Sequence, residues 1–124
     1  MKITWMRTGA DGQTTFEDLE IASTQRERGV ETAVVPVSGA FFRSEQPALD
    51  MDFHNAPRRQ FVIPLGGELV VEAGDGSTRR IATGDALLAD DVTGGGHKSR
   101  FVPDGAKMVF LTLDDDVDPA EWRA

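Results

Sequence analysis

The sequence predicts an all-β protein, and three observations carry that prediction. Apolar runs of four to six residues recur along the chain, most clearly between positions 61 and 90. Gly-Gly, Gly-Asp-Gly and Thr-Gly-Asp turn signals separate these runs, and helical periodicity is poor. Short strands with turns between them favour a sandwich or a barrel. The length of 124 residues predicts one domain, spanning residues 1–124.

The elements before the middle of the chain are expected to be short. A first strand is expected at residues 3–5, and further strands at 34–37 and 41–42, interrupted by a proline and a Ser-Gly pair. The only plausible helical segments are a short helix from Thr15 to Ala22 and a turn over residues 119–122.

The second half carries clearer strand patterns. Residues 68–72 and 78–81 flank a Gly-Asp-Gly turn, which predicts a hairpin. Another strand is expected over residues 107–113, where apolar side chains occupy both faces. The acidic segment 114–118 is expected to be solvated.

Alternation along residues 58–65 makes a specific prediction about two faces. One face would carry Arg58, Gln60, Val62 and Pro64, and the other Arg59, Phe61, Ile63 and Leu65. The second face is apolar, so we expect it to be buried against another sheet or a partner subunit. The latter arrangement predicts a homodimer.

Composition and charge restrict the partners. The net charge is −8, from 21 acidic against 13 basic residues, which argues against nucleic acid and anionic membrane surfaces. The absence of cysteine excludes disulfides and thiolate chemistry. No apolar run approaches the ~20 residues of a transmembrane helix or has the form of a signal peptide. We therefore expect a cytoplasmic protein.

The two histidines are the residues most suggestive of chemistry. If the extended chain runs back through 52–56, His54 lies at the start of the central strand, close to Gln60. His97 follows three glycines, which let the chain turn sharply and approach a neighbour closely. A surface histidine is the more common outcome for either one alone, but together they favour a shared site.

At these residues the chain resembles the cupin superfamily, a jelly-roll β-barrel. The first cupin motif reads Gly, five residues, His-x-His, three or four residues, Glu, six residues, Gly. His54, Gln60 and Gly67 fall at the first histidine, the glutamate and the final glycine. The second histidine and the opening glycine are replaced by Ala56 and Ala48.

The second cupin motif is matched less closely. Gly84 and His97 correspond to its glycine and histidine, with an interval two residues longer than usual. Asp90 stands where the motif has proline, and Phe101 where it has asparagine. The resemblance covers about residues 50–113 and implies an antiparallel jelly-roll barrel, a fold in which homodimers are common.

The resemblance implies a divalent metal ion, such as zinc, iron, nickel or manganese, in the barrel. Carried over residue by residue, its ligands here are His54, Gln60 and His97, a neutral set that should bind a cation weakly. The missing negative charge could come from Asp52 or from one residue of the pair 90–91. We expect such a protein to bind or act on a small organic ligand, without assigning a reaction or catalytic residue.

Two alternatives stay open. In the first, the pocket is free of metal and Arg58 binds a small anion through its guanidinium. In the second, the protein is a structural or regulatory dimer whose interior is filled by side chains. General acid–base chemistry by either histidine also remains open, whereas no Ser-His-Asp or nucleotide-binding signature is present.

Overall fold

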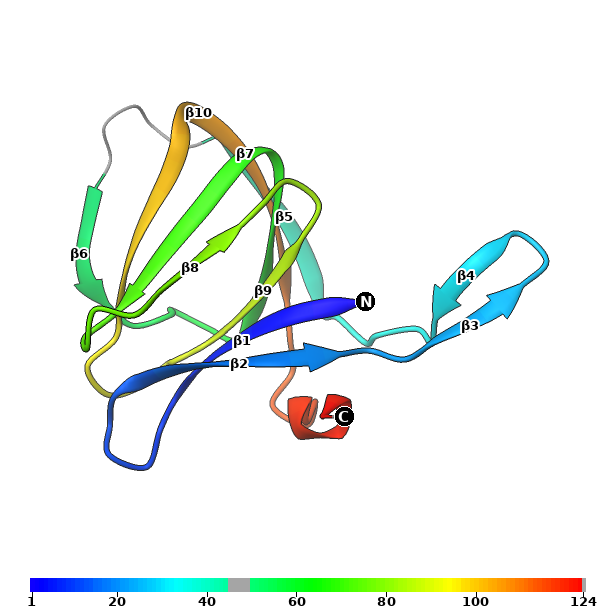
Figure 1. Ribbon diagram of the computed structural model, residues 1–124, viewed down its shortest axis with the longest axis horizontal. Helices are drawn as coiled ribbons and strands as arrows, with labels where there is room; N and C mark the ends of the chain where they lie inside the picture. The colour runs from blue at the N-terminus through cyan, green and yellow to red at the C-terminus, as the bar shows by residue number, and fades with distance from the viewer. Residues whose placement is uncertain (45–49, 124) are drawn as a thin grey trace.

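Ten strands and one 3₁₀ helix form the described part of the chain, residues 1–44 and 50–123, in a computed structural model (Figure 1). In chain order they are β1 Lys2–Thr8, β2 Thr14–Glu20, β3 Ser23–Arg26, β4 Gly29–Thr32, β5 Gly39–Ser44, β6 Asp50–His54, β7 Gln60–Ala73, β8 Thr78–Ile81, β9 Ala86–Asp90, β10 His97–Thr112 and η1 Pro119–Trp122. These residues contain no α-helix, so the all-β prediction is confirmed. Within the described ranges, no helix is long and apolar enough to cross a membrane.

Eight strands form one sheet, in the order β2-β1-β9-β7-β10-β5, with β8 paired to β7 and β6 to β10. The first part of β7 pairs with β9 and its last part with β8. Strand β10 changes partners in the same way, from β6 to β5. The two long strands therefore connect two halves of the sheet, and one cluster of buried side chains draws on both halves.

The bend in the long strands depends on a glycine. Gly67 has a φ of 101°, and a Cβ there would lie 2.6 Å from the carbonyl oxygen of Val102 on β10. The register between β7 and β10 also shifts in this region, between Val102 and Met108. A side chain at position 67 would push the two strands apart where both change partners.

The expectation of a purely antiparallel barrel needs correction. Strands β1 and β9 pair in parallel, from Ile3 opposite Ala86 to Arg7 opposite Asp90. One edge of β1 is taken by its hairpin partner β2, so β9 pairs at the other edge, and its direction is fixed by its antiparallel pairing with β7. Among the described strands, the path ends at β2 and β5 without closing into a ring.

The predicted alternation along the central strand is confirmed from position 60 onward, where β7 begins. Val62 belongs to the core cluster between the two sheet halves, and Phe61 to a second cluster on the opposite face. Phe61 is 5% exposed, and the Trp122 ring of η1 lies 6.1 Å from its centroid. The apolar face that suggested a homodimer is thus largely covered by this chain's own C-terminal segment, although Leu65 stays exposed.

The structure settles the expectations about the N-terminal elements at 15–22, 34–37 and 41–42 and about the C-terminal turn at 119–122. The segment Thr15 to Ala22 is not helical, because residues 14–20 pair along their whole length with β1. Residues 34–37 form no strand, whereas 41–42 lie in β5 as predicted. The turn at 119–122 is confirmed as a 3₁₀ helix, capped by the side chain of Asp118.

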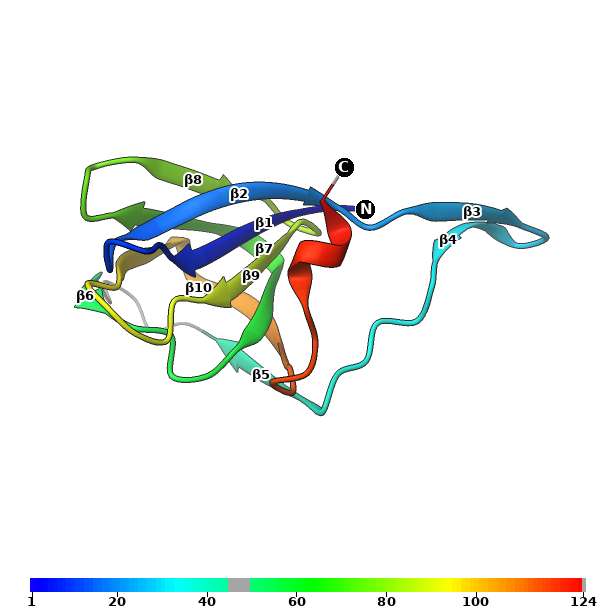
Figure 2. The ribbon, with the colours of Figure 1, turned by 90° about the horizontal axis from the view of Figure 1, so that it is seen from below.

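The β3–β4 hairpin was not expected. Its two strands pair only with each other, and the hairpin projects away from the rest of the molecule (Figures 1 and 2). All of its strand residues are exposed except Thr32. A mostly exposed connection, residues 33–38, leads from it to β5, and within it Val35 packs against the second core cluster.

The C-terminal segment is attached to β2 by charge. Arg123 donates two hydrogen bonds to Glu17, of 2.7 and 3.0 Å, and Arg7 donates a third of 3.1 Å. The hydrogen bond from Arg123 is the largest cause that lowers the pKa of Glu17, and the same bond raises the pKa of Arg123. This contact keeps η1 beside Phe61.

Candidate functional site

A cavity of about 280 Å³ opens between the two halves of the sheet. Its wall includes His54, Gln60 and His97, the three residues predicted to bind metal, although they come from β6, β7 and β10. The apolar wall is formed by Met6, Ala56, Pro57, Val62, Leu69, Val71, Leu87, Ala89, Phe101 and Phe110. Because this space remains open, the described interior is not completely filled by side chains.

The two histidines lie side by side because their strands pair. His97 is the register partner of His54 in the β6–β10 ladder, and their ring centroids are 4.5 Å apart at an angle of 54°. Gly96 permits this approach: its φ is 74°, and a Cβ there would lie 2.4 Å from the carbonyl oxygen of His54. The glycine run thus serves the close approach that the sequence predicts for it.

The imidazole of His97 is hydrogen-bonded to a buried carboxylate. Its Nδ1 lies 2.6 Å from Oδ2 of Asp91, which also accepts a hydrogen bond of 2.8 Å from the Thr14 hydroxyl. Asp91 is 0% exposed and His97 5%. Of the candidate aspartates, Asp91 is the one that reaches a predicted ligand with its side chain. Its other oxygen, Oδ1, is buried without a partner among the described residues.

The second histidine is oriented by a main-chain group. His54 Nδ1 lies 2.8 Å from the carbonyl oxygen of Asp52, whose own side chain is 91% exposed. A carbonyl oxygen and an ionised carboxylate can only accept hydrogen bonds, so each partner places the imidazole proton on Nδ1. In the neutral ring the lone pair then lies on Nε2, and neither Nε2 has a hydrogen-bond partner among the described residues.

Gln60 is the third predicted ligand, and its amide oxygen is already hydrogen-bonded to a neighbouring arginine. Its Oε1 accepts a hydrogen bond of 3.2 Å from Arg58, while its side chain is buried. Arg58 therefore reaches the site only through Gln60, and it is not among the residues described as lining the cavity. Arg59 points to the other side of the sheet, where its Nε donates to Asp90 at 2.8 Å.

The positions that depart from the cupin motifs have structural explanations in two cases. Ala56, where a second histidine would stand, is buried, and its main-chain N–H donates to the carbonyl oxygen of Asp91 at 3.2 Å. Phe101 occupies the asparagine position and lines the cavity instead. Ala48 lies outside the described residues.

The sequence did not predict the one arginine that lines the cavity among the described residues. Arg43 of β5 lines the cavity, and its guanidinium carbon lies 4.6 Å from the ring centroid of Phe110. Alternation places it on the same face of β5 as Phe41, which stacks on Phe110 at 4.6 Å. That spacing was readable in the sequence, but nothing there placed β5 beside the last strand.

The donor set fits a divalent metal ion only in part. Two imidazoles backed by acceptors are the arrangement usual for metal-binding histidines. Gln60 could add an amide oxygen, but a guanidinium competes for that oxygen. In the described ranges, no group of three or more His, Cys, Asp or Glu residues is placed to hold a metal ion. The geometry therefore provides two imidazole ligands, His54 and His97, and one amide ligand, Gln60, whose oxygen is already hydrogen-bonded to Arg58.

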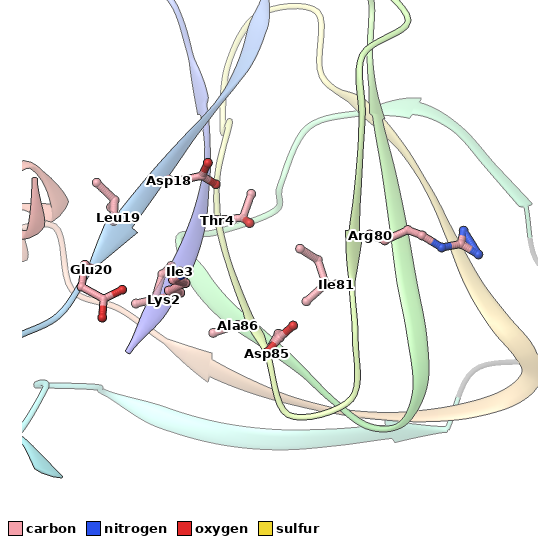
Figure 3. Close-up of a pocket in the computed structure, with 10 residues that line it drawn as sticks. All are labelled: Lys2, Ile3, Thr4, Asp18, Leu19, Glu20, Arg80, Ile81, Asp85 and Ala86. Carbon is pink, nitrogen blue, oxygen red and sulfur yellow. The ribbon is translucent and has the colours of Figure 1, made fainter. Parts of the chain in front are cut away.

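A larger hollow of about 480 Å³ lies elsewhere, between β1–β2 and the β8–β9 connection (Figure 3). Most charged side chains around it are already paired. Glu20 lies 3.3 Å from the N-terminal ammonium and Asp18 2.6 Å from Arg79, while Arg80 points away toward Glu68 (Figure 3). This hollow has the character of ordinary surface, so the histidine cavity is the better candidate site.

Comparisons with known proteins add no family assignment: neither a scan against protein-family models nor a search of the curated proteins finds a match.

Proposed function

We propose that this chain is a cupin-type jelly-roll protein that binds a small organic ligand beside a divalent metal ion held by His54 and His97. The two facing halves of the sheet and the cavity between them support the fold proposal. The motif spacing around His54 and Gly67 adds to it. We assign no catalytic residue.

The observation that carries the proposal is the orientation of the histidine pair. Both Nδ1 atoms face acceptors, at 2.6 and 2.8 Å, and the rings are 4.5 Å apart. Both Nε2 lone pairs are therefore free of hydrogen bonds to the described residues, and both rings line the same cavity, which two imidazole ligands of one ion require.

The charge of the site limits the affinity. Neutral imidazoles and the Gln60 amide provide no negative charge to offset that of the cation. The carboxylate of Asp91, which is hydrogen-bonded to His97, would supply that charge. Imidazole nitrogen suits zinc, iron and nickel, and manganese prefers the oxygen ligands that are scarce here. A bound ion would supply Lewis-acid polarisation of an oxygen atom of the ligand.

The test is metal binding by tag-free protein that has been treated with a chelator. We expect one equivalent of Zn²⁺ or Ni²⁺ to bind in calorimetry, and His97→Ala and His54→Ala each to abolish this binding. Asp75→Asn, which changes a carboxylate in an exposed turn, is the matched control and should bind as the original protein does. Substoichiometric metal that His97→Ala leaves unchanged would overturn the proposal.

A second candidate is favoured by the contact between Arg58 and Gln60. A guanidinium 3.2 Å from the third ligand repels a cation and attracts an anion. In this alternative the cavity holds a small anion without metal. An Arg58→Ala variant that binds small carboxylates as tightly as the unchanged protein would exclude a role for Arg58 in it.

A further inference from the structure

Two arginines gather around a pair of stacked aromatic rings at the cavity. Phe41 and Phe110 are register partners across β5 and β10, and their rings are nearly parallel, at 2°. Arg43 lies over Phe110 at 4.6 Å, and Arg58 lies 5.5 Å from Phe41. A guanidinium over an aromatic ring keeps its edge nitrogens available for hydrogen bonds in the ring plane.

This aromatic pair joins the arginines to the candidate site. Phe110 and Arg43 both line the cavity, and Arg58 contacts Gln60, which lines it too. In the described part of the chain, no carboxylate lies within ion-pair distance of either arginine. Among the described residues, Arg43 and Arg58 therefore have no carboxylate partner, and Arg58 donates to the Gln60 amide oxygen.

The charge around the cavity is opposite to that of the whole protein. The chain carries 21 acidic residues against 13 basic ones, yet no Asp or Glu appears among the described residues that line this cavity. The nearest buried carboxylate, Asp91, is already engaged by His97 and Thr14. A local positive potential in an acidic protein favours an anionic group at this position.

Most of the wall is apolar, although Asn55 and Ser99 line it as well as the histidines and Gln60. Ten of its residues are apolar, from Met6 on β1 to Phe110 on β10. A ligand that fills about 280 Å³ must therefore place an apolar body against them. Its charged group has to remain at the end where Arg43 lies.

We infer that the ligand of this cavity is a small monocarboxylic acid with an apolar body, whose carboxylate is bound by Arg43 with Arg58 in support. The planar fork of a single guanidinium matches a carboxylate through two parallel hydrogen bonds. This inference rests on the proposed ligand cavity, but it does not depend on the metal. Arg43 is the specificity-determining residue, and Arg58 strengthens the positive field.

The test is a calorimetric or NMR titration with benzoate, 3-methylbutanoate and hexanoate, each compared with its neutral amide, in the presence of a chelator. We expect at least one acid to bind about tenfold more tightly than its amide, because the amide has no charge for the guanidinium. Arg43→Gln should remove this preference, and Arg43→Lys should retain part of it. Arg26→Gln, on the projecting hairpin, is the matched control and should change nothing.

Several results would overturn the inference. Equal binding of acids and their amides would overturn it, and so would the absence of binding by any acid. Binding of inorganic phosphate alone would also overturn it. The same holds if the Arg43→Gln protein melts like the unchanged protein and still prefers the acid to its amide. Metal binding is measured without these ligands, so it separates the two proposals. Arg43→Gln should bind Zn²⁺ as the unchanged protein does, and a variant at His97 should lose the metal.

Discussion

At the residue scale, metal binding by His54 and His97 depends on which nitrogen of each imidazole carries the proton. Asp91 sets this for His97 and the Asp52 carbonyl sets it for His54. The two partners differ in kind, because a carboxylate can be removed by substitution and a main-chain carbonyl cannot. Asp91 is therefore the residue whose change tests the orientation of the pair.

We predict that Asp91→Asn weakens Zn²⁺ binding by about 10- to 100-fold, the usual effect of losing a partner behind a metal-binding histidine. An asparagine keeps the shape but removes the charge and can present a donor to Nδ1, which favours the other tautomer. Calorimetry measures the affinity, and a thermal melt checks that the variant is folded.

Thr14→Val provides the comparison. It removes the second hydrogen bond to Asp91 and leaves the contact between Asp91 and His97 in place. Its effect on metal affinity should be much smaller than that of Asp91→Asn. Equal losses in the two variants would mean that general destabilisation, rather than the orientation of His97, controls binding.

At the scale of elements, the meeting of β6 and β10 depends on Gly96. A Cβ there meets the His54 carbonyl at 2.4 Å in addition to a positive φ, whereas Gly76, with φ of 87°, has open space around it. Gly76→Ala should therefore cost only the backbone strain of an L residue at positive φ, about 1–2 kcal/mol. Gly96→Ala should cost more and also weaken metal binding, because β6 must move. Chemical denaturation measures the free energy of unfolding of both variants, and calorimetry measures their affinity for Zn²⁺. Equal losses of stability and equal metal affinities in Gly76→Ala and Gly96→Ala would contradict the prediction.

The attachment of η1 to β2 predicts a dependence on pH. The folded structure lowers the pKa of Glu17 below its usual 4.5, through Arg123 first. Its contribution to stability is therefore full above the unfolded pKa and is lost as the pH falls through the lower, folded value. The difference in melting temperature between the unchanged protein and Glu17→Gln should be constant near neutrality and shrink on acidification. A difference that grows in acid, or that Glu121→Gln reproduces, would contradict this assignment.

The sequence could predict those elements whose pattern is local. The Asp-Gly turn before β8 is one example, because pairing inside one hairpin defines it. The alternation at 60–63 is another, because the two faces of a strand follow from the side-chain period of two alone. The helix expected from Thr15 to Ala22 is wrong because pairing with β1, rather than a local pattern, decides the form of β2. The parallel pairing of β1 and β9 joins residues more than 80 positions apart, so no local signal reports it.

The same reasoning explains which site residues were found. His54 and His97 could be placed together because motif spacing supplied the long-range information. Asp91 was one of several candidate charges, and the structure alone shows that it reaches His97. Arg43 was missed because its role arises from stacking on Phe110, which lies 67 positions later (110 − 43).

At the scale of the whole molecule, the homodimer stays a prediction. The face that first suggested it is largely covered by this chain's own C-terminal segment, with Leu65 still exposed, so it no longer points to a partner subunit. The β3–β4 hairpin and the exposed Val34 and Phe42 are now the surfaces to examine. Light scattering should give a mass near twice 13.5 kDa. A monomer at micromolar concentration would refute the dimer.

The most direct test of the histidine pair is nitrogen NMR of the two imidazoles, since the chain contains only two. At mildly alkaline pH both rings should show the proton on Nδ1. Added Zn²⁺ should then shift both Nε2 resonances together and saturate at one equivalent. A proton on Nε2 in either ring, or Nε2 resonances that do not respond to Zn²⁺, would contradict the account.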